Sequence, residues 1–301
     1  TGVQTCALPI LIVITRSTTS VDRISHLKDK ITLERADVTD YDHLGRIIAK
    51  HSPEVIIHLA GETSHSKSFE NPLYDLDVNT KSTLYILEKI KQLNLKCRFI
   101  LGSTFIVIGR PQELPVTEQS VCNPTTIYGA NRLASEVYCK IYHNVYGIDA
   151  ITFRITNSFG PREQFIPSKN AINFLIHKAF KKEPIPIFDK GNFFKDVVYV
   201  SDVVSAISTI MEKGKPGDLY WISSGNKTWF YDLGTWLEEL TGTKVQYVES
   251  PQYTKKTDVG NFVVDNSKLK SLGWSIQTPV KDGIKKTLDY FAKLEIGRAH
   301  V

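Results

Sequence analysis

Tyr128 and Arg132 are the residues of this 301-residue chain whose types and spacing point most directly to chemistry. They stand four positions apart, a spacing that brings two side chains together on one face of a helix. A free phenol has a pKa of about 10, so acid/base work near neutral pH requires a shift of about three units, or about 4 kcal/mol. An adjoining cation provides such a shift because it favours the phenolate. Such a pair is chemically able to take up and release a proton; the alternative, an ordinary Tyr/Arg pair on a helix surface, stays open.

The segments around this pair alternate between strands and helices. Apolar, β-branched runs predict strands at Leu11–Ile14, Ile31–Arg35, Val55–Ala60, Arg98–Gly102 and Ala150–Arg154. Apolar residues at helical spacing predict helices at Tyr41–His51, Leu76–Leu93 and Asn131–Tyr146. Such alternation is typical of an α/β fold with a doubly wound parallel sheet. After Gly160 prolines break the pattern, which indicates a smaller α+β domain towards the C-terminus.

Composition excludes several classes of protein. With 42% apolar and 23% charged residues, the chain is not a disordered tail, a collagen-like fibre or a disulfide scaffold. A net charge of +5 without a basic run does not call for nucleic acid, but it suits an anionic small molecule. The four cysteines lack metal-ligand spacing, so we expect no metal site and a reducing, cytoplasmic location. No apolar run reaches the roughly 18 residues that a membrane helix requires.

The two ends of the chain look foreign. Codons can be chosen for Val3–Ile10 and for Glu295–Val301 that are reverse complements of each other, and the shared string resembles a sequencing adapter. We therefore expect residues 1–10 and 295–301 to be translated adapter, and we leave them out of the reasoning about the fold.

Between these ends, a series of short motifs follows a fixed order. They are Asp37-Val38-Thr39-Asp40, His58-Leu59-Ala60-Gly61, Asn79, Gly102-Ser103-Thr104, Tyr128-Gly129-Ala130-Asn131-Arg132, Arg154–Pro161, Phe194–Val200 and Leu272-Gly273-Trp274. Each motif alone is weak, but in this order they resemble the extended short-chain dehydrogenase/reductase family, which contains nucleotide-sugar epimerases, dehydratases and reductases. The likeness runs from about Leu11 to Lys293. It implies a Rossmann-like sheet, NAD(P) as cofactor and a nucleotide sugar as substrate.

The resemblance assigns the cofactor site by position. Leu11–Ile14 would be the family's second strand, and the residues after it, Thr15 and Arg16, would face the adenosine ribose. A neutral residue followed by a guanidinium favours a 2′-phosphate, and therefore NADP over NAD. The alternative, that Arg16 is only a solvated residue after a strand, stays open. The other implied cofactor contacts are Asp37, Val38, Leu59, Ala60, Gly61, Asn79, Tyr128 and Arg132.

One part of the family pattern is absent. The family opens with a strand and a glycine-rich loop whose backbone N–H groups bind the pyrophosphate. Nothing before Leu11 matches them, and that strand would lie in the middle of the sheet. We therefore expect the chain as written to bind a dinucleotide weakly. The resemblance places the dinucleotide-binding domain at residues 11–160 and about 196–224, and the substrate domain at residues 161–195 and about 225–294.

The resemblance also assigns the catalytic residues. In the family a Tyr, here Tyr128, exchanges a proton with the sugar while hydride moves to or from the nicotinamide, and Thr104 matches the Ser/Thr that bonds the reacting oxygen. The usual cation is Lys; the longer, planar fork of Arg132 puts activity in question. Family 4,6-dehydratases carry a glutamate two positions after that Thr, often with another acid between. The corresponding residues here are Phe105 and Ile106, whose side chains cannot donate or accept a proton. We therefore expect a 4-epimerase or keto-sugar reductase acting at C4, and not a dehydratase.

Two alternatives stay open. One is a catalytically impaired family member that binds a dinucleotide or a protein partner. The other is a flavonoid- or steroid-type reductase on the same fold, whose pocket would be apolar, without Lys195 or Asn157 near the ligand.

On the substrate side the implied residues would contact the sugar, the diphosphate and the base. They are Ser64, Asn157, Phe165, Ile166, Lys195 and Lys256, with Lys255 as an alternative to Lys256. Lysine offers a point charge to phosphate but lacks the bidentate geometry of arginine. Family members often dimerise through two helices each, so Leu76–Leu93 and Asn131–Tyr146 are candidates for a homodimer interface.

Overall fold

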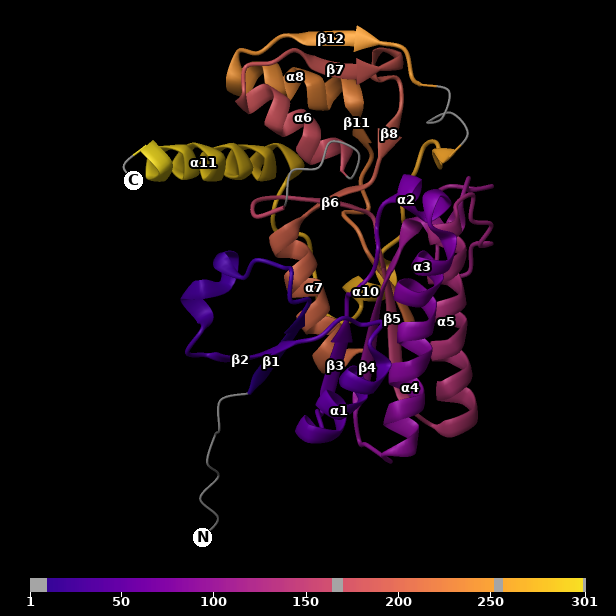
Figure 1. Ribbon diagram of the computed structural model, residues 1–301. Coiled ribbons are helices and arrows are strands. Elements are labelled where there is room, and N and C mark those ends of the chain that lie inside the picture. Colours follow the sequence, from indigo (N-terminus) through magenta and orange to yellow (C-terminus); the bar gives the residue numbers. More distant parts are fainter. Residues whose placement is uncertain (1–9, 164–169, 252–256, 300–301) are drawn as a thin grey trace.

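Four parallel strands form the centre of the structure. A computed structural model describes residues 10–163, 170–251 and 257–299 of the chain. Four of its strands pair in parallel in the order β10-β5-β4-β3 (Figure 1). Their bounds are Val55–His58 for β3, Arg98–Thr104 for β4, Asp149–Ile155 for β5 and Leu219–Ile222 for β10. Strands β4 and β5 are buried along most of their length, as expected of parallel strands that are covered on both faces.

Strands β1 (Leu11–Thr15) and β2 (Ile31–Arg35) form a separate parallel pair. Within the described ranges, no strand hydrogen-bonds to the second edge of β1 or of β3. Aliphatic side chains of these two strands are exposed, with 37% of Ile14 and 41% of Ile57 open to solvent. The doubly wound parallel sheet predicted from the sequence is therefore present, but as two sheets rather than one continuous sheet.

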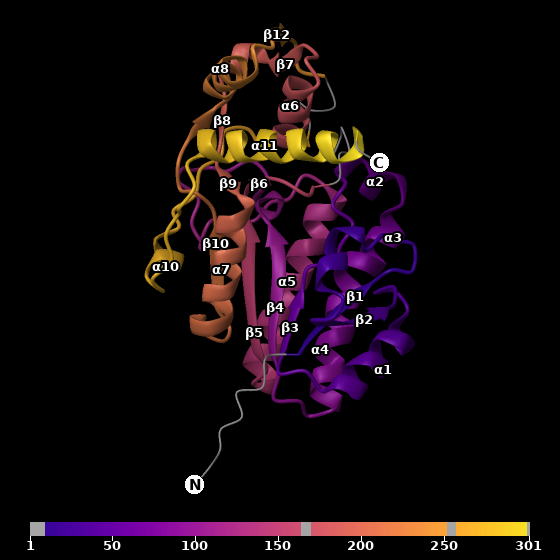
Figure 2. The same cartoon turned by 90° about the vertical axis from the view of Figure 1, so that its left-hand side faces the viewer.

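Helices cover both faces of the four-stranded sheet. Helices α1, α4 and α5 lie on one face, and α7 lies on the other (Figures 1 and 2). Phe99 and Ile100 are neighbours in β4 but belong to opposite apolar clusters, because successive side chains of a strand alternate between faces. The bounds of these helices are Tyr41–His51 for α1, Ser82–Gln92 for α4, Ile127–Tyr146 for α5 and Val200–Lys213 for α7.

The helix predicted at Leu76–Leu93 starts earlier and contains a π-helical segment. Helix α3 (Pro72–Leu76), the π-helical η2 (Asp77–Lys81) and α4 follow one another without a break. Hydroxyl groups compete for the backbone oxygens of η2: Ser82 Oγ donates to Val78 O, and Ser135 Oγ donates to Asn79 O at 2.6 Å. Such side-chain insertions disturb the regular helical ladder, and apolar spacing alone does not reveal them.

Helix α5 begins one turn before the predicted start at Asn131. Thr126 caps it, since its Oγ1 accepts a hydrogen bond from the Gly129 N–H at 3.0 Å. Tyr128 therefore lies inside the first turn, with Arg132 one turn further along. The predicted end at Gly147 is confirmed, and its φ of 69° is the left-handed conformation that glycine favours after a helix.

A smaller lobe lies above the carboxyl ends of the four strands (Figure 1). Two helices and a parallel strand pair enclose its apolar core, and α11 lies across its base (Figure 2). These elements are α6 (Ala171–Phe180), β7 (Ile185–Phe188), α8 (Phe230–Thr241), β12 (Val245–Val248) and α11 (Val280–Ala299). Helix α11 includes the first residues of the segment 295–301, whose foreign origin stays a prediction. The domain boundaries stay predictions as well.

Short elements connect these parts. They are η1 (Asp22–Leu27), α2 (His65–Glu70), η3 (Phe105–Ile108), β6 (Asn157–Phe159), η4 (Asp189–Gly191), β8 (Phe194–Lys195), β9 (Val197–Tyr199), β11 (Thr228–Trp229) and α10 (Ser267–Lys270). Strand β6 pairs with β9, and β8 pairs with β11.

A buried ion pair joins α5 to the two central strands. Arg154 Nη2 of β5 lies 2.7 Å from Glu136 Oε2 of α5, and the two residues are 4% and 8% exposed. Ser103 Oγ of β4 hydrogen-bonds to the same carboxylate. The guanidinium also lies over the ring of Trp221, 5.3 Å from its centroid. The two charges neutralise each other away from water. Removal of one side chain would therefore leave the other charge buried without a partner, which is costly.

We expect Glu136→Gln to lower the free energy of unfolding by about 3 kcal/mol or more, because the guanidinium of Arg154 loses its counter-charge in the interior. Urea denaturation at neutral pH measures this loss. Lys140→Ala, an exposed position on the same helix, is the control and should change stability by less than about 0.5 kcal/mol. A loss of less than about 1 kcal/mol in Glu136→Gln would contradict the role given to the pair.

Candidate active site

The phenol of Tyr128 hydrogen-bonds with the side chain of Thr104, the last residue of β4. Both residues are buried, with 7% and 6% of their surfaces exposed. Thr104 Oγ1 also accepts the Ile106 N–H at 3.3 Å, which fixes the hydroxyl against the backbone of η3. The start of α5 and the end of β4 therefore bring together two of the residues assigned to the chemistry.

Arg132 places a positive charge beside this phenol. It is 4% exposed, and its Nη1 donates one long hydrogen bond of 3.5 Å to Ala60 O. Its Nε–H is buried and has no hydrogen-bond partner among the described residues. The guanidinium therefore retains a donor that a bound group could use.

The pKa of Tyr128 nevertheless lies above its ordinary value. Burial raises it, and this effect exceeds the lowering by the charge of Arg132 and by the Thr104 hydrogen bond. The expectation that the cation brings the phenol into the neutral range is wrong for the structure without a ligand. The sequence shows a charge four residues away, but not how completely the ring is withdrawn from water. Near neutral pH Tyr128 is a neutral phenol that can donate a proton.

Gly61 shapes the wall beside Arg132. A Cβ at this position would come within 2.6 Å of Asn79 Oδ1 and 3.5 Å of Arg132 Nη1. Asn79 Nδ2 donates to Glu62 O at 3.1 Å, whereas Asn79 Oδ1 is buried and lacks a partner within the described part of the chain. An unsatisfied acceptor and an unsatisfied donor thus occur next to a position without a side chain. Ribose hydroxyls, which both donate and accept, match these groups, so the residues present fit the nicotinamide ribose of a dinucleotide, while the weak binding expected without the glycine-rich loop stays a prediction.

The residues assigned to the adenosine end follow β1 and β2. Thr15 ends β1, and the exposed Arg16 follows it and accepts a hydrogen bond at its carbonyl from Arg35 Nη1 at 3.0 Å. Asp37 Oδ1 accepts the N–H and the hydroxyl of Thr39, at 3.0 and 2.8 Å, so Asp37 has a structural role in a turn. The adenine and ribose contacts predicted for these residues and for the half-buried Val38, like the contact of the exposed Leu59, stay predictions.

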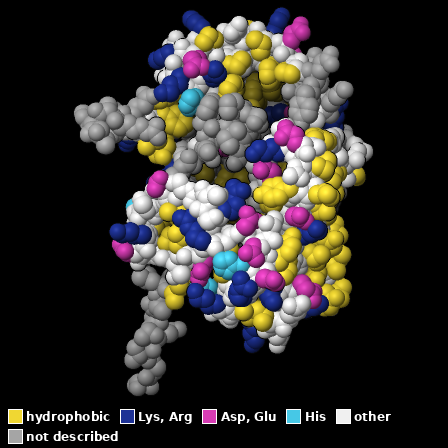
Figure 3. All heavy atoms as spheres, viewed as in Figure 1, with side chains coloured by type: hydrophobic (Ala, Val, Ile, Leu, Met, Phe, Trp, Pro, Cys, Tyr) yellow, Lys and Arg dark blue, Asp and Glu magenta, His cyan; other side chains and the backbone are white. Residues whose placement is uncertain are grey.

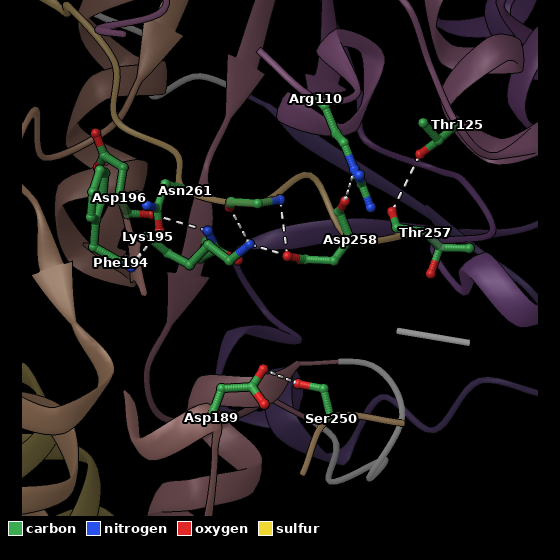
Figure 4. A network of polar contacts seen from close by, with 12 residues as sticks. Arg110, Thr125, Asp189, Phe194, Lys195, Asp196, Ser250, Thr257, Asp258 and Asn261 are labelled. Carbon is green, nitrogen blue, oxygen red and sulfur yellow. Dashed lines mark hydrogen bonds and ion pairs between the residues drawn. The ribbon is translucent and has the colours of Figure 1, made fainter. Parts of the chain in front are cut away.

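Lys195 belongs to a polar network on the substrate side (Figure 4). Its Nζ lies 2.7 Å from Asp258 Oδ1 and 2.6 Å from Gly260 O, and the residue is 8% exposed. Burial lowers the pKa of Lys195, while Asp258 acts in the opposite direction. Asn157, the first residue of β6, donates from Nδ2 to Asp196 O at 3.2 Å. Lys195 is therefore a buried cation with a carboxylate partner, and not a solvated surface residue.

Of the other predicted substrate residues, only Ser64 lies within the described part of the chain. Ser64 caps α2, because its Oγ accepts the Lys67 N–H at 3.4 Å. Phe165, Ile166 and Lys256 lie outside the described residues, as does the alternative Lys255.

Two residues near Tyr128 make contacts that the sequence did not predict. The ring of His65 stacks on that of Tyr128, with centroids 5.7 Å apart and planes at 21°. Asp75 is 1% exposed and accepts a hydrogen bond from Asn131 Nδ2 at 2.7 Å. Burial raises the pKa of Asp75. The family resemblance puts His65, with Ser64 and Ser68, in the loop expected to border the sugar, but it does not indicate the stacking on Tyr128. Asp75 has the sequence pattern of an ordinary acidic residue of a helix.

The described residues contain no group of three or more His, Cys, Asp or Glu side chains that could hold a metal ion. Of the helices in the described ranges, none combines the length and the apolar character needed to cross a bilayer.

Comparisons with known proteins agree with this fold. A model of the GDP-mannose 4,6-dehydratase family matches residues 9–287. The UDP-glucose 4-epimerase of Mycolicibacterium smegmatis is 28% identical over 266 residues, which cover 87% of this chain and 83% of that protein. The dTDP-glucose 4,6-dehydratase 1 of Escherichia coli is 27% identical over 288 residues, covering 87% and 79%.

A solved structure gives the same result. The UDP-glucose 4-epimerase of Thermotoga maritima, crystallised with UDP-glucose, matches with a TM-score of 0.86 and 28% identity over 95% of this chain and 91% of that chain. Together with the family match over most of its length, this shows that the chain belongs to the extended short-chain dehydrogenase/reductase family, an enzyme family that includes nucleotide-sugar epimerases and dehydratases.

Proposed function

We propose that this protein is an NAD(P)-dependent enzyme that acts at C4 of a nucleotide-activated sugar, as a 4-epimerase or a keto-sugar reductase. The observation that carries the proposal is the contact between the Thr104 side chain and the Tyr128 phenol, with the Arg132 guanidinium beside them. Epimerases and dehydratases both occur among the relatives.

The chain's own residues supply the proton chemistry. Tyr128 exchanges a proton with the oxygen on C4, and Thr104 hydrogen-bonds to the same oxygen. Arg132 stabilises the phenolate that forms when the proton leaves, and the burial of the three side chains strengthens this interaction. NAD(P), when bound, accepts or returns the hydride at C4.

Other residues of the site would hold the cofactor. The missing side chain at Gly61 leaves space for the nicotinamide ribose, and the unsatisfied polar atoms of Asn79 and Arg132 suit its hydroxyl groups. At the other end, the exposed Arg16 supports NADP over NAD, because a guanidinium pairs with a 2′-phosphate. Lys195 would meet the diphosphate of the sugar nucleotide by exchanging its contact with Asp258, whose side chain is 41% exposed.

Phe105 and Ile106 argue against dehydration. The ring of Phe105 packs edge-on against that of Phe262, with centroids 5.2 Å apart, and Ile106 is 4% exposed. Neither side chain can remove a proton from C5 or donate one to a departing hydroxyl. The proposal is therefore hydride transfer at C4 without elimination.

A catalytically impaired protein is the second candidate, and two observations favour it. The pKa of Tyr128 is raised by burial in spite of Arg132, and the Arg132 Nε–H has no described partner. A guanidinium that reaches past the ribose would leave the cofactor poorly oriented.

We also propose a homodimer through the outer face of α5. Val137, Ile141 and Val145 are exposed at spacings of four residues, and a groove of about 330 Å³ lies beside them. Pro124, Ala130, Leu133, Ala134, Val137 and Tyr138 line this groove. The flank over α5 shows a continuous apolar patch in Figure 3. A face of this kind is typical of a contact between protein chains. We also propose a cytoplasmic location for the protein, as expected from its cysteines.

Tyr128→Phe should lower kcat at least a hundredfold, because the variant loses the proton donor and acceptor at C4. The measurement is turnover of the sugar nucleotide, with thermal unfolding to show that the fold is kept. Tyr138→Phe on the same helix should leave kcat unchanged. Full activity of Tyr128→Phe would disprove the mechanism.

Arg132→Lys should raise activity, because a compact ammonium favours the phenolate and also bonds a ribose. Steady-state kinetics on both forms of the protein measures the change. No turnover in either form, with the sugar nucleotide still bound, would instead favour the impaired protein.

Val137→Lys combined with Ile141→Lys should convert a dimer to a monomer, since burying two unpaired charges at the interface is costly. Light scattering during size-exclusion chromatography measures the mass. Val204→Lys, an exposed valine on α7, is the control. A monomeric starting protein, or a variant that stays dimeric, would rule out this interface.

A further inference from the structure

His65 lies between the two parts of the site that the proposed function assigns to opposite ends of the substrate. On one side its ring stacks on the catalytic phenol, with centroids 5.7 Å apart. On the other side the carboxylate of Asp258 lies close enough to favour a protonated imidazole. Asp258 in turn is 2.7 Å from Lys195 Nζ. One half-buried side chain therefore connects the reacting centre with the cation proposed for the diphosphate.

This position has a simple meaning for a sugar nucleotide. In a hexopyranose the diphosphate is attached at C1, and the reacting oxygen is attached at C4, on opposite sides of the ring. A substrate that reaches from Lys195 to Tyr128 therefore extends its sugar ring along His65. The hydroxyl groups carried by the ring face the side chain at this place.

The chemical state of His65 suits a hydroxyl group. Burial lowers the pKa of His65, although Asp258 and Asp75 act against this, so the ring is neutral near neutral pH. A neutral imidazole has one N–H donor and one acceptor nitrogen. No hydrogen bond to either nitrogen comes from the described residues, and the stacking on Tyr128 uses only the ring face. A sugar hydroxyl both donates and accepts, which matches this pair of groups.

We propose that His65 is a specificity-determining residue, which hydrogen-bonds a hexose hydroxyl between C1 and C4 while it holds the phenol of Tyr128 by stacking. The inference rests on the proposed function and assigns to this side chain the recognition of the sugar rather than of the nucleotide. A site that hydrogen-bonds a hydroxyl discriminates strongly against a ligand that lacks the group.

The test compares binding of UDP-glucose with binding of UDP, by calorimetry on the whole chain. His65→Phe keeps an aromatic ring on Tyr128 but removes both nitrogens, so the affinity for UDP-glucose should fall about tenfold while that for UDP is unchanged. His65→Asn keeps a donor and an acceptor and should recover most of the affinity for UDP-glucose. His26→Phe, an exposed histidine in η1, is the control and should match the unaltered protein.

The outcomes separate the two levels of the proposal. If His65→Phe binds both ligands as the unaltered protein does, or loses affinity equally for both, the role of His65 is disproved while the proposed function stands. If the unaltered protein binds neither UDP nor UDP-glucose, the proposed function fails for uridine sugar nucleotides, and the inference as tested fails with it. If His65→Phe does not fold, His65→Asn decides the question. A tenfold loss of affinity for UDP-glucose in His65→Asn would then contradict the proposed hydrogen bond between His65 and the sugar.

Discussion

The site depends on the buried ion pair between Glu136 and Arg154. Tyr128 and Arg132 are carried by α5, whereas Thr104 is carried by β4, so their contact requires α5 to keep a fixed position over the sheet. The carboxylate of Glu136 provides this by bonding both Arg154 of β5 and Ser103, the neighbour of Thr104. An ion pair of this kind adds little net stability compared with apolar residues of the same size, but each partner is costly to remove. Its value here is therefore geometric.

Withdrawal from water has opposite effects on the groups around the site. It raises the pKa of Tyr128 and of Asp75, and it lowers the pKa of His65 and Lys195. In every case the neutral form is favoured, since desolvation penalises charge of either sign. Arg132 stays charged in this environment because a guanidinium does not lose its proton in proteins. Beside the phenol, Arg132 therefore keeps a positive charge and a donor without a partner among the described residues.

Much of the fold and part of the site could be predicted from the sequence. The alternation of apolar strands and amphipathic helices reflects local periodicity, so the four-stranded sheet and the helices on its faces were expected. Motif order indicated that Thr104 and Tyr128 belong to one site; the structure has a hydrogen bond between their side chains, and their catalytic roles stay predictions. The π-helical segment around Asn79 depends on hydroxyl groups that come from another helix, and the ion pair of Lys195 joins residues 63 positions apart. His65 stacks on Tyr128 across a similar distance. Such long-range contacts leave no periodic trace in the chain.

The separate pair of β1 and β2 has a consequence for the cooperativity of the molecule. Their ladder shares no hydrogen bonds with the four-stranded sheet, so this pair can separate its strands without disturbing the ladder of β4 and β5. Local opening of a region with few buried contacts requires much less free energy than global unfolding. The amide protons of β1 and β2 therefore exchange with solvent through fluctuations of that pair alone, whereas those of the central strands exchange only when the core itself is lost. The end of the molecule assigned to adenosine is thus less protected than the central strands.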